Sequence, residues 1–171
     1  HYFFNIVENL YIYYMIEAFF NFFSNNLEWG DYVPHRWFIL FISSFFMILF
    51  LQSGIDKMLS FSGNMSYFRD HFKNTFFKNQ FKFLLVFITF LELVTGGLCL
   101  YVFIANFTIG EGVALFLMPY YCMSLFLVLL TILCLFFGQR IAKDYAGAVN
   151  LGIYFLIALI GLSVPVLFLE L

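Results

Sequence analysis

The stretch FKFLLVFITFLELVTGGLCLYVFI, from Phe81 to Ile104, decides the fold of this chain. About 20 apolar residues in a helix cross the hydrocarbon core of a bilayer, and this run exceeds that length. Close to its middle it carries one acid, Glu92. A carboxylate at that depth is energetically costly, so an intramembrane acid is a candidate functional residue. The stretch therefore predicts an integral membrane protein with a buried polar position at Glu92.

The composition supports the same conclusion. Hydrophobic residues make up 64% of the 171 residues, with 28 Phe and 11 Tyr, whereas soluble domains contain roughly 45–50% apolar residues. Charged residues amount to 11%, which is too few to solvate a globular surface of this size. The formal net charge of -2 gives no indication of nucleic-acid binding. We expect the lipid bilayer to be the main environment of this chain.

Three further apolar runs cover residues 37–59, 113–137 and 146–169. Each should be a helix, because backbone amides find no water partners in lipid. The short connectors 105–112 and 138–145 make neighbouring helices antiparallel. The predicted fold is an all-α antiparallel four-helix transmembrane bundle that occupies residues 36–171 as one domain.

The N-terminal segment, residues 1–35, follows a different pattern. Its apolar centre, Leu10 to Ile16, is shorter than a membrane span, and polar residues such as Glu8 and Glu17 interrupt its flanks. This suits an amphipathic interfacial helix, or a helix packed against a partner, followed by a turn-rich linker on the outer side. We expect it to dock onto other membrane protein subunits. A fifth span is the alternative.

Seven of the eight Lys and Arg residues lie at or between the ends of predicted spans, in the segments 57–82 and 138–145. They are Lys57, Arg69, Lys73, Lys78, Lys82, Arg140 and Lys143. Basic loops stay in the cytoplasm, so both bundle termini should face the outer compartment. Within the first segment, Met65, Phe68, Phe72 and Phe76 recur at helical spacing. This indicates a short amphipathic helix on the cytoplasmic leaflet, with an ordinary solvated loop as an equal alternative.

Thr89, Glu92 and Gly96 share one face of the second span. Gly96 removes side-chain bulk one turn from the acid, which allows close approach of a helix or a planar ligand. On the first span, Gln52 lies at nearly the depth of Glu92, so an acid–amide hydrogen bond is expected. Two interpretations compete. Glu92 either is a protonated acid that fastens the two helices, or it binds a quinone-like headgroup or relays a proton.

The remaining polar residues indicate anchoring rather than catalysis. Lys57 is expected to extend its charge to the headgroups, with Asp56 pairing with it or with Arg140. Arg36 at the opposite end of that span is a conventional interface anchor. All three histidines lie outside the spans, and no H-E-x-x-H motif occurs, so we expect no haem or metal site.

These residues also resemble a known family. Arg36 followed by a span that ends Ser53-Gly54-Ile55-Asp56-Lys57-Met58-Leu59 is similar to the opening of DoxX-like proteins. The run from Glu92 to Gly96-Gly97 resembles the E…GG helix of that family, and Phe137-Gly138-Gln139-Arg140 leads into the last helix in a similar way. The resemblance covers residues 36–162.

The resemblance implies a small bacterial inner-membrane protein, since the family takes its name from a subunit of a thiosulfate:quinone oxidoreductase. It implies a subunit associated with a quinone-linked redox complex, with quinone near Glu92. The positions that it points to are Arg36, Gly54, Lys57, Glu92 and Gly96. One alternative is a non-catalytic accessory or assembly subunit of a larger membrane complex. Another is a carrier of lipids or small molecules, which requires a lateral opening between helices.

Overall fold

The computed structural model describes residues 34–108 and 113–169. Within these ranges the chain is helical and contains no strand. The helices are α2 (Pro34–Leu59), α3 (Phe61–Phe72), α4 (Phe81–Thr108), α5 (Val113–Ala142) and α6 (Tyr145–Leu169). The N-terminal helix expected before residue 34 lies outside the described residues.

Four of these helices are long and apolar enough to cross a membrane: Arg36–Leu59, Phe81–Phe107, Phe116–Ala142 and Tyr145–Ser163. They coincide with the four predicted spans, so the all-helical fold is confirmed. Their outward faces carry exposed aromatic side chains, among them Phe41, Phe90 and Phe126. Surfaces of this kind are typical of contact with lipid. The fold therefore supports integration into a membrane.

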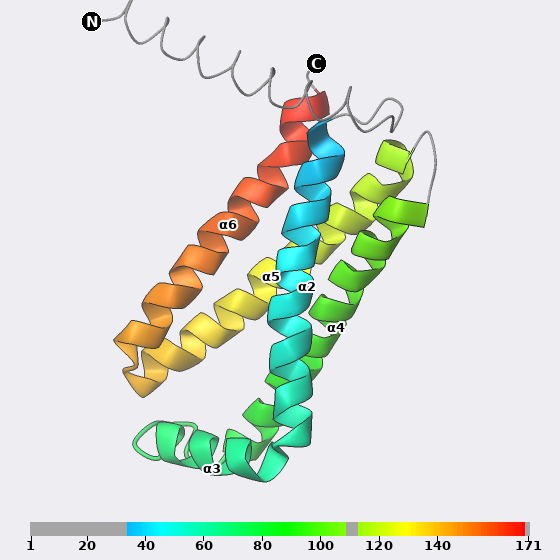
Figure 1. The fold of residues 1–171 in the computed structure, drawn as a ribbon. Helices are drawn as coiled ribbons and strands as arrows, with labels where there is room; N and C mark the ends of the chain where they lie inside the picture. Colours follow the sequence, from blue (N-terminus) through cyan, green and yellow to red (C-terminus); the bar gives the residue numbers. More distant parts are fainter. Residues whose placement is uncertain (1–33, 109–112, 170–171) are drawn as a thin grey trace, which may run out of the picture.

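The two ends of the helix assembly differ (Figure 1). At one end, α3 lies across the assembly, where α2 ends and α4 begins. At the other end, the guanidinium of Arg36 donates a hydrogen bond to the backbone carbonyl of Asn106, whose side-chain amide donates to the Arg36 carbonyl at 3.4 Å. The start of α2 is thus fastened to the end of α4.

Hydrogen bonds from buried hydroxyl groups join the remaining helices. The hydroxyls of Thr95 on α4 and Thr131 on α5 lie 2.8 Å apart. The Tyr121 hydroxyl on α5 donates to the Gly161 carbonyl on α6 at 2.9 Å, and Tyr121 is completely buried. Lipid tails are as apolar as the helix surfaces, so packing and such bonds hold the helices together.

The connection between α5 and α6 is shorter than predicted. Helix α5 continues to Ala142, so Arg140 belongs to a helix and the connector shrinks to Lys143 and Asp144. Lys143 adopts φ 65, and the amide of Asp144 donates to the Gln139 carbonyl at 2.9 Å. This is the Schellman geometry that ends many helices. Asp144 then caps α6, because its side chain accepts a hydrogen bond from the Gly147 amide at 3.0 Å.

Replacing Asp144 by Ala should lower the free energy of unfolding by about 1 kcal/mol, because the first turn of α6 loses its cap. Asp144→Asn keeps an acceptor at the same place and should retain most of the stability. Chemical denaturation of the two variants in the same detergent measures the difference. Equal losses in both variants would show that the hydrogen-bond acceptor at position 144 is not what stabilises α6.

Helix α3 confirms the amphipathic interpretation of the basic connector over residues 61–72. Phe72 is buried, whereas Phe76 lies beyond the helix end and is 85% exposed, so its assignment to the same face was wrong. The Thr75 hydroxyl explains the termination. It donates to the Phe72 carbonyl at 2.9 Å and accepts from the Phe77 amide at 3.1 Å, which stabilises a turn in place of a further helical turn.

Candidate functional site: a buried ion pair beside an aromatic pocket

Glu92 lies on the face of α4 that packs against α2 and is 1% exposed. Both of its carboxylate oxygens accept hydrogen bonds from the Lys57 ammonium, at 2.9 and 3.0 Å. The Ser53 hydroxyl donates to the same carboxylate at 3.1 Å. Lys57 and Ser53 are one turn apart on α2, so a single face of that helix supplies both partners.

The prediction that Gln52 forms a hydrogen bond with Glu92 is wrong, and the reason is the helical phase of α2. Neighbouring residues on a helix point about 100° apart, so Gln52 cannot share the face of Ser53 even though its depth is similar. Gln52 is exposed. The expectation that Lys57 extends its charge to the headgroups is also wrong, because its ammonium turns inward to Glu92. Of the two partners expected for Asp56, Lys57 is thereby taken by Glu92.

Two glycines bring α2 and α4 close enough for this ion pair. A Cβ on Gly54 would lie 2.8 Å from the Leu93 side chain, and a Cβ on Gly96 would lie 2.8 Å from the backbone nitrogen of Leu51. Gly54 adjoins Ser53, and Gly96 follows Glu92 by one turn. The helices therefore pack closely beside the charged groups.

Two other residues singled out in the sequence lie apart from this cluster. The Thr89 hydroxyl donates to the Leu85 carbonyl of its own helix at 2.7 Å, so its hydrogen bond remains within α4. Arg36 lies at the far end of α2, where it bonds with Asn106. Of the residues that the sequence indicated, Gly54, Lys57, Glu92 and Gly96 lie together in this cluster. Ser53 also belongs to it, although the sequence did not single it out as a partner.

The hydrogen bonds of the Lys57 ammonium are fully used inside this cluster. An ammonium has three protons to donate. Its partners are the two oxygens of Glu92, the Ser53 hydroxyl at 2.6 Å and, at the longer distance of 3.5 Å, the Ser53 carbonyl. In this arrangement Lys57 has no proton left to offer a ligand, so the cluster acts as a fastener between α2 and α4.

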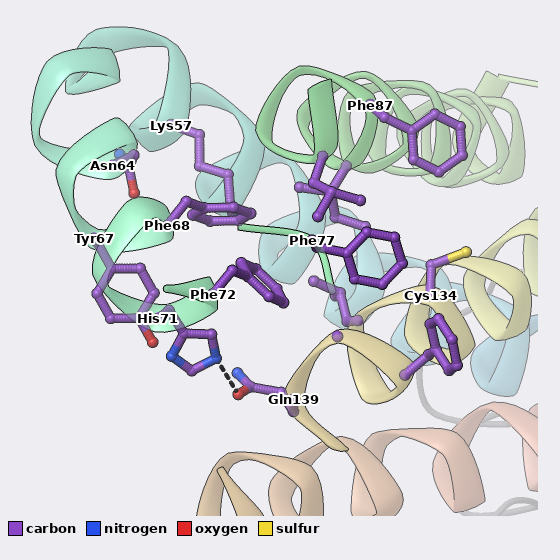
Figure 2. A pocket seen from close by; sticks show the side chains of 15 residues that line it. Lys57, Asn64, Tyr67, Phe68, His71, Phe72, Phe77, Phe87, Cys134 and Gln139 are labelled. Atoms are coloured by element: carbon purple, nitrogen blue, oxygen red, sulfur yellow. Dashed lines mark hydrogen bonds between the residues drawn. The ribbon is translucent and has the colours of Figure 1, made fainter. Parts of the chain in front are cut away.

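A pocket of about 380 Å³ lies beside this cluster, beneath α3 (Figure 2). Residues of α3, of the following turn, of α4 and of α5 form its walls, and Lys57 of α2 contributes as well. The lining residues are Lys57, Asn64, Tyr67, Phe68, His71, Phe72, Phe77, Leu84, Phe87, Ile88, Cys134, Leu135, Phe137, Gly138 and Gln139. The pocket is thus largely apolar and aromatic, as ligand sites commonly are.

The polar side chains of the pocket gather toward one side. His71 Nε2 lies 3.1 Å from Gln139 Oε1, and the Tyr67 ring stacks on the imidazole with centroids 5.1 Å apart. With the imidazole proton directed to Oε1, the Gln139 amide group offers N–H donors. Figure 2 shows this pair on the side of the pocket away from Phe87 and Cys134.

Sequence reasoning did not find this pocket. His71 and Gln139 are separated by 68 positions in the chain, and the run Phe137-Gly138-Gln139-Arg140 gave no indication of a pocket. The helical spacing of Phe68 and Phe72 was the available signal, since both residues line the pocket. That spacing indicated an apolar face on α3 but not what the face would cover.

Comparison of the chain with protein-family models, curated proteins and solved structures found no match.

Proposed function

We propose that this chain is a DoxX-like integral membrane subunit of a quinone-linked redox complex in a bacterial inner membrane. Its four long helices form an antiparallel bundle in this proposal. Two contacts support that arrangement: Arg36 with Asn106 at one end of α2, and Lys57 with Glu92 toward the other. The basic residues around α3 orient that end to the cytoplasm.

The observation that carries the quinone assignment is the aromatic pocket beneath α3. Its volume of about 380 Å³ lies within the range for small-molecule sites. A quinone headgroup is flat and apolar, with carbonyl oxygens that accept hydrogen bonds. Rings such as Phe68 and Phe72 provide stacking surfaces, and the His71–Gln139 pair provides polar contacts for a carbonyl.

Glu92 has an indirect role in this proposal. The headgroup binds on the α3 side of the ion pair, where Lys57 lines the pocket. Glu92 holds the Lys57 ammonium away from the ligand, so it shapes the wall rather than touching the quinone. The proposed quinone site thus lies beside Ile88, one turn of α4 away from Glu92, the position that the sequence indicated.

A second candidate function is a non-catalytic accessory or assembly subunit. The saturated hydrogen bonds of Lys57, Ser53 and Glu92 favour it, because a cluster that satisfies itself needs no ligand. In that case the pocket beneath α3 would receive a side chain from a partner protein. The N-terminal segment 1–35 is the proposed contact to such subunits.

The first test is purification of the native protein in mild detergent, followed by mass spectrometry of bound lipids and proteins. Stoichiometric quinone, or a co-purified redox enzyme, supports the quinone-linked function. A large non-redox assembly without quinone favours the accessory function. A wild-type chain that neither retains quinone nor binds added quinone saturably would contradict the ligand assignment.

Replacing His71 by Phe should weaken quinone binding about threefold to tenfold, since the hydrogen bond that orients the Gln139 amide is lost while an aromatic ring is kept. Ser66→Ala is the matched control, because Ser66 is an exposed residue of the same helix outside the pocket lining. Titration of quinone into each purified variant gives the dissociation constants. Unchanged binding in His71→Phe would remove this residue from the site.

A further inference from the structure

The pocket beneath α3 continues onto the outer surface of the helix assembly. Phe87 of α4 and Phe137 of α5 line it and are 42% and 59% exposed. Both residues belong to helices that are candidate membrane spans. In Figure 1, α4 and α5 diverge toward the end at which α3 lies across the assembly. The pocket therefore opens sideways between α4 and α5.

The depth of this opening follows from helix geometry. Lys82 and Arg140 mark the headgroup level on α4 and α5, because basic side chains lie at the interface. At 1.5 Å per residue, Phe87 lies about 7.5 Å deeper than Lys82, and Cys134 about 9 Å deeper than Arg140. The opening consequently faces acyl chains rather than water.

The walls of the pocket are polar on one side and apolar on the other. His71 and Gln139 form its polar side, whereas Phe87 and Cys134 lie on the opposite, apolar side (Figure 2). On the water side, α3 covers the pocket through Phe72, which is 6% exposed. A ligand that matches this gradient has a polar head and a long apolar tail.

We propose that the pocket takes its ligand laterally from the bilayer: a membrane lipid with a carbonyl-bearing ring beside His71 and Gln139 and a hydrocarbon tail that leaves between α4 and α5 past Cys134. This rests on the proposed function, because it specifies the form of quinone that the same pocket binds. A tailless water-soluble quinone would fill the head site but leave the opening empty.

The test compares two ligands of the same ring type in wild-type protein in lipid nanodiscs: a menaquinone with an isoprenoid tail, and 2,3-dimethyl-1,4-naphthoquinone, which has no tail. The variant Cys134→Phe narrows the opening. It should weaken binding of the tailed quinone about tenfold or more, because tail contacts are lost, and change binding of the tailless quinone less than about threefold. Cys122→Phe is the matched control, since Cys122 is a partly exposed thiol of α5 outside the pocket lining.

A second measurement uses the wild-type protein and needs no variant. Bound tailed quinone should slow alkylation of Cys134 by N-ethylmaleimide relative to Cys122, as read by peptide mass spectrometry, and the tailless quinone should not. Equal effects of both quinones on Cys134, or equal losses of both in Cys134→Phe, would overturn the lateral opening and leave the quinone site intact. Failure of the wild-type protein to bind either quinone would overturn the site and the opening together.

Discussion

Replacing Glu92 by Met is expected to lower the free energy of unfolding by about 3–5 kcal/mol, the range for breaking a buried ion pair by removing one partner. Lys57 would keep its charge in a site where its side chain is only 14% exposed. Its ammonium would retain the Ser53 hydroxyl and lose both carboxylate bonds. Chemical denaturation in detergent measures the loss.

The double variant Lys57→Met and Glu92→Met should recover most of that stability. Apolar residues of similar volume often replace a buried ion pair with little change in stability, because neither charge has to be desolvated. We expect the double variant to lie within about 1 kcal/mol of the wild-type protein. Asp56→Asn is the control, since Asp56 is an exposed acid beside Lys57. If the double variant loses as much stability as the two single variants together, Lys57 and Glu92 do not act as one unit.

The same double variant tests the role of Glu92 in function. Met at position 57 keeps an unbranched apolar stem in the pocket wall, so a purely structural ion pair predicts that quinone binding survives. A proton relay through Glu92 predicts that binding survives but proton-coupled turnover in the complex fails. Comparing quinone titration with turnover of the reconstituted complex separates these two roles.

The membrane spans were predictable because their signal is local. Four runs of apolar residues needed no knowledge of their neighbours, and the helices lie where the runs lie. Helix ends were less accurate, since α5 continues through Gly138 to Ala142. There the Schellman turn at Lys143 ends the helix, and that geometry depends on backbone conformation rather than on hydropathy.

The site was only partly predictable. Glu92 and Gly96 stood out as an acid and a small residue in an apolar run, and both are buried. Depth along α2 alone favours Gln52 as the partner of Glu92, whereas the helical phase directs Ser53 and Lys57 to it. Lys57 was treated as an anchor because the reach of its long side chain back toward α4 depends on how closely the two helices pack. The pocket depends on how α3 lies across the ends of α4 and α5, which no local pattern determines.

Gly96→Ala is the second change with a large expected effect, and Gly97→Ala is its matched control. A Cβ at position 96 would meet the Leu51 backbone nitrogen at 2.8 Å, whereas a Cβ at position 97 would have no atom within 4 Å. Overpacking of this kind costs about 1–3 kcal/mol, while the alanine at position 97 should be neutral or gain up to about 1 kcal/mol from helix propensity. Thermal unfolding of the two variants in one detergent gives the contrast.

Gly96→Ala should also weaken the Lys57–Glu92 ion pair. The atom that the new Cβ would meet belongs to the backbone, which cannot move aside as a flexible side chain can. An alanine at position 96 must push α2 away from α4, which lengthens the contacts between Lys57 and Glu92. The effects of Gly96→Ala and of Glu92→Met should therefore not add, since part of the ion pair is already lost in the glycine variant. Full additivity would mean that the helices keep their distance at Glu92, and that the close approach at Gly96 serves packing alone.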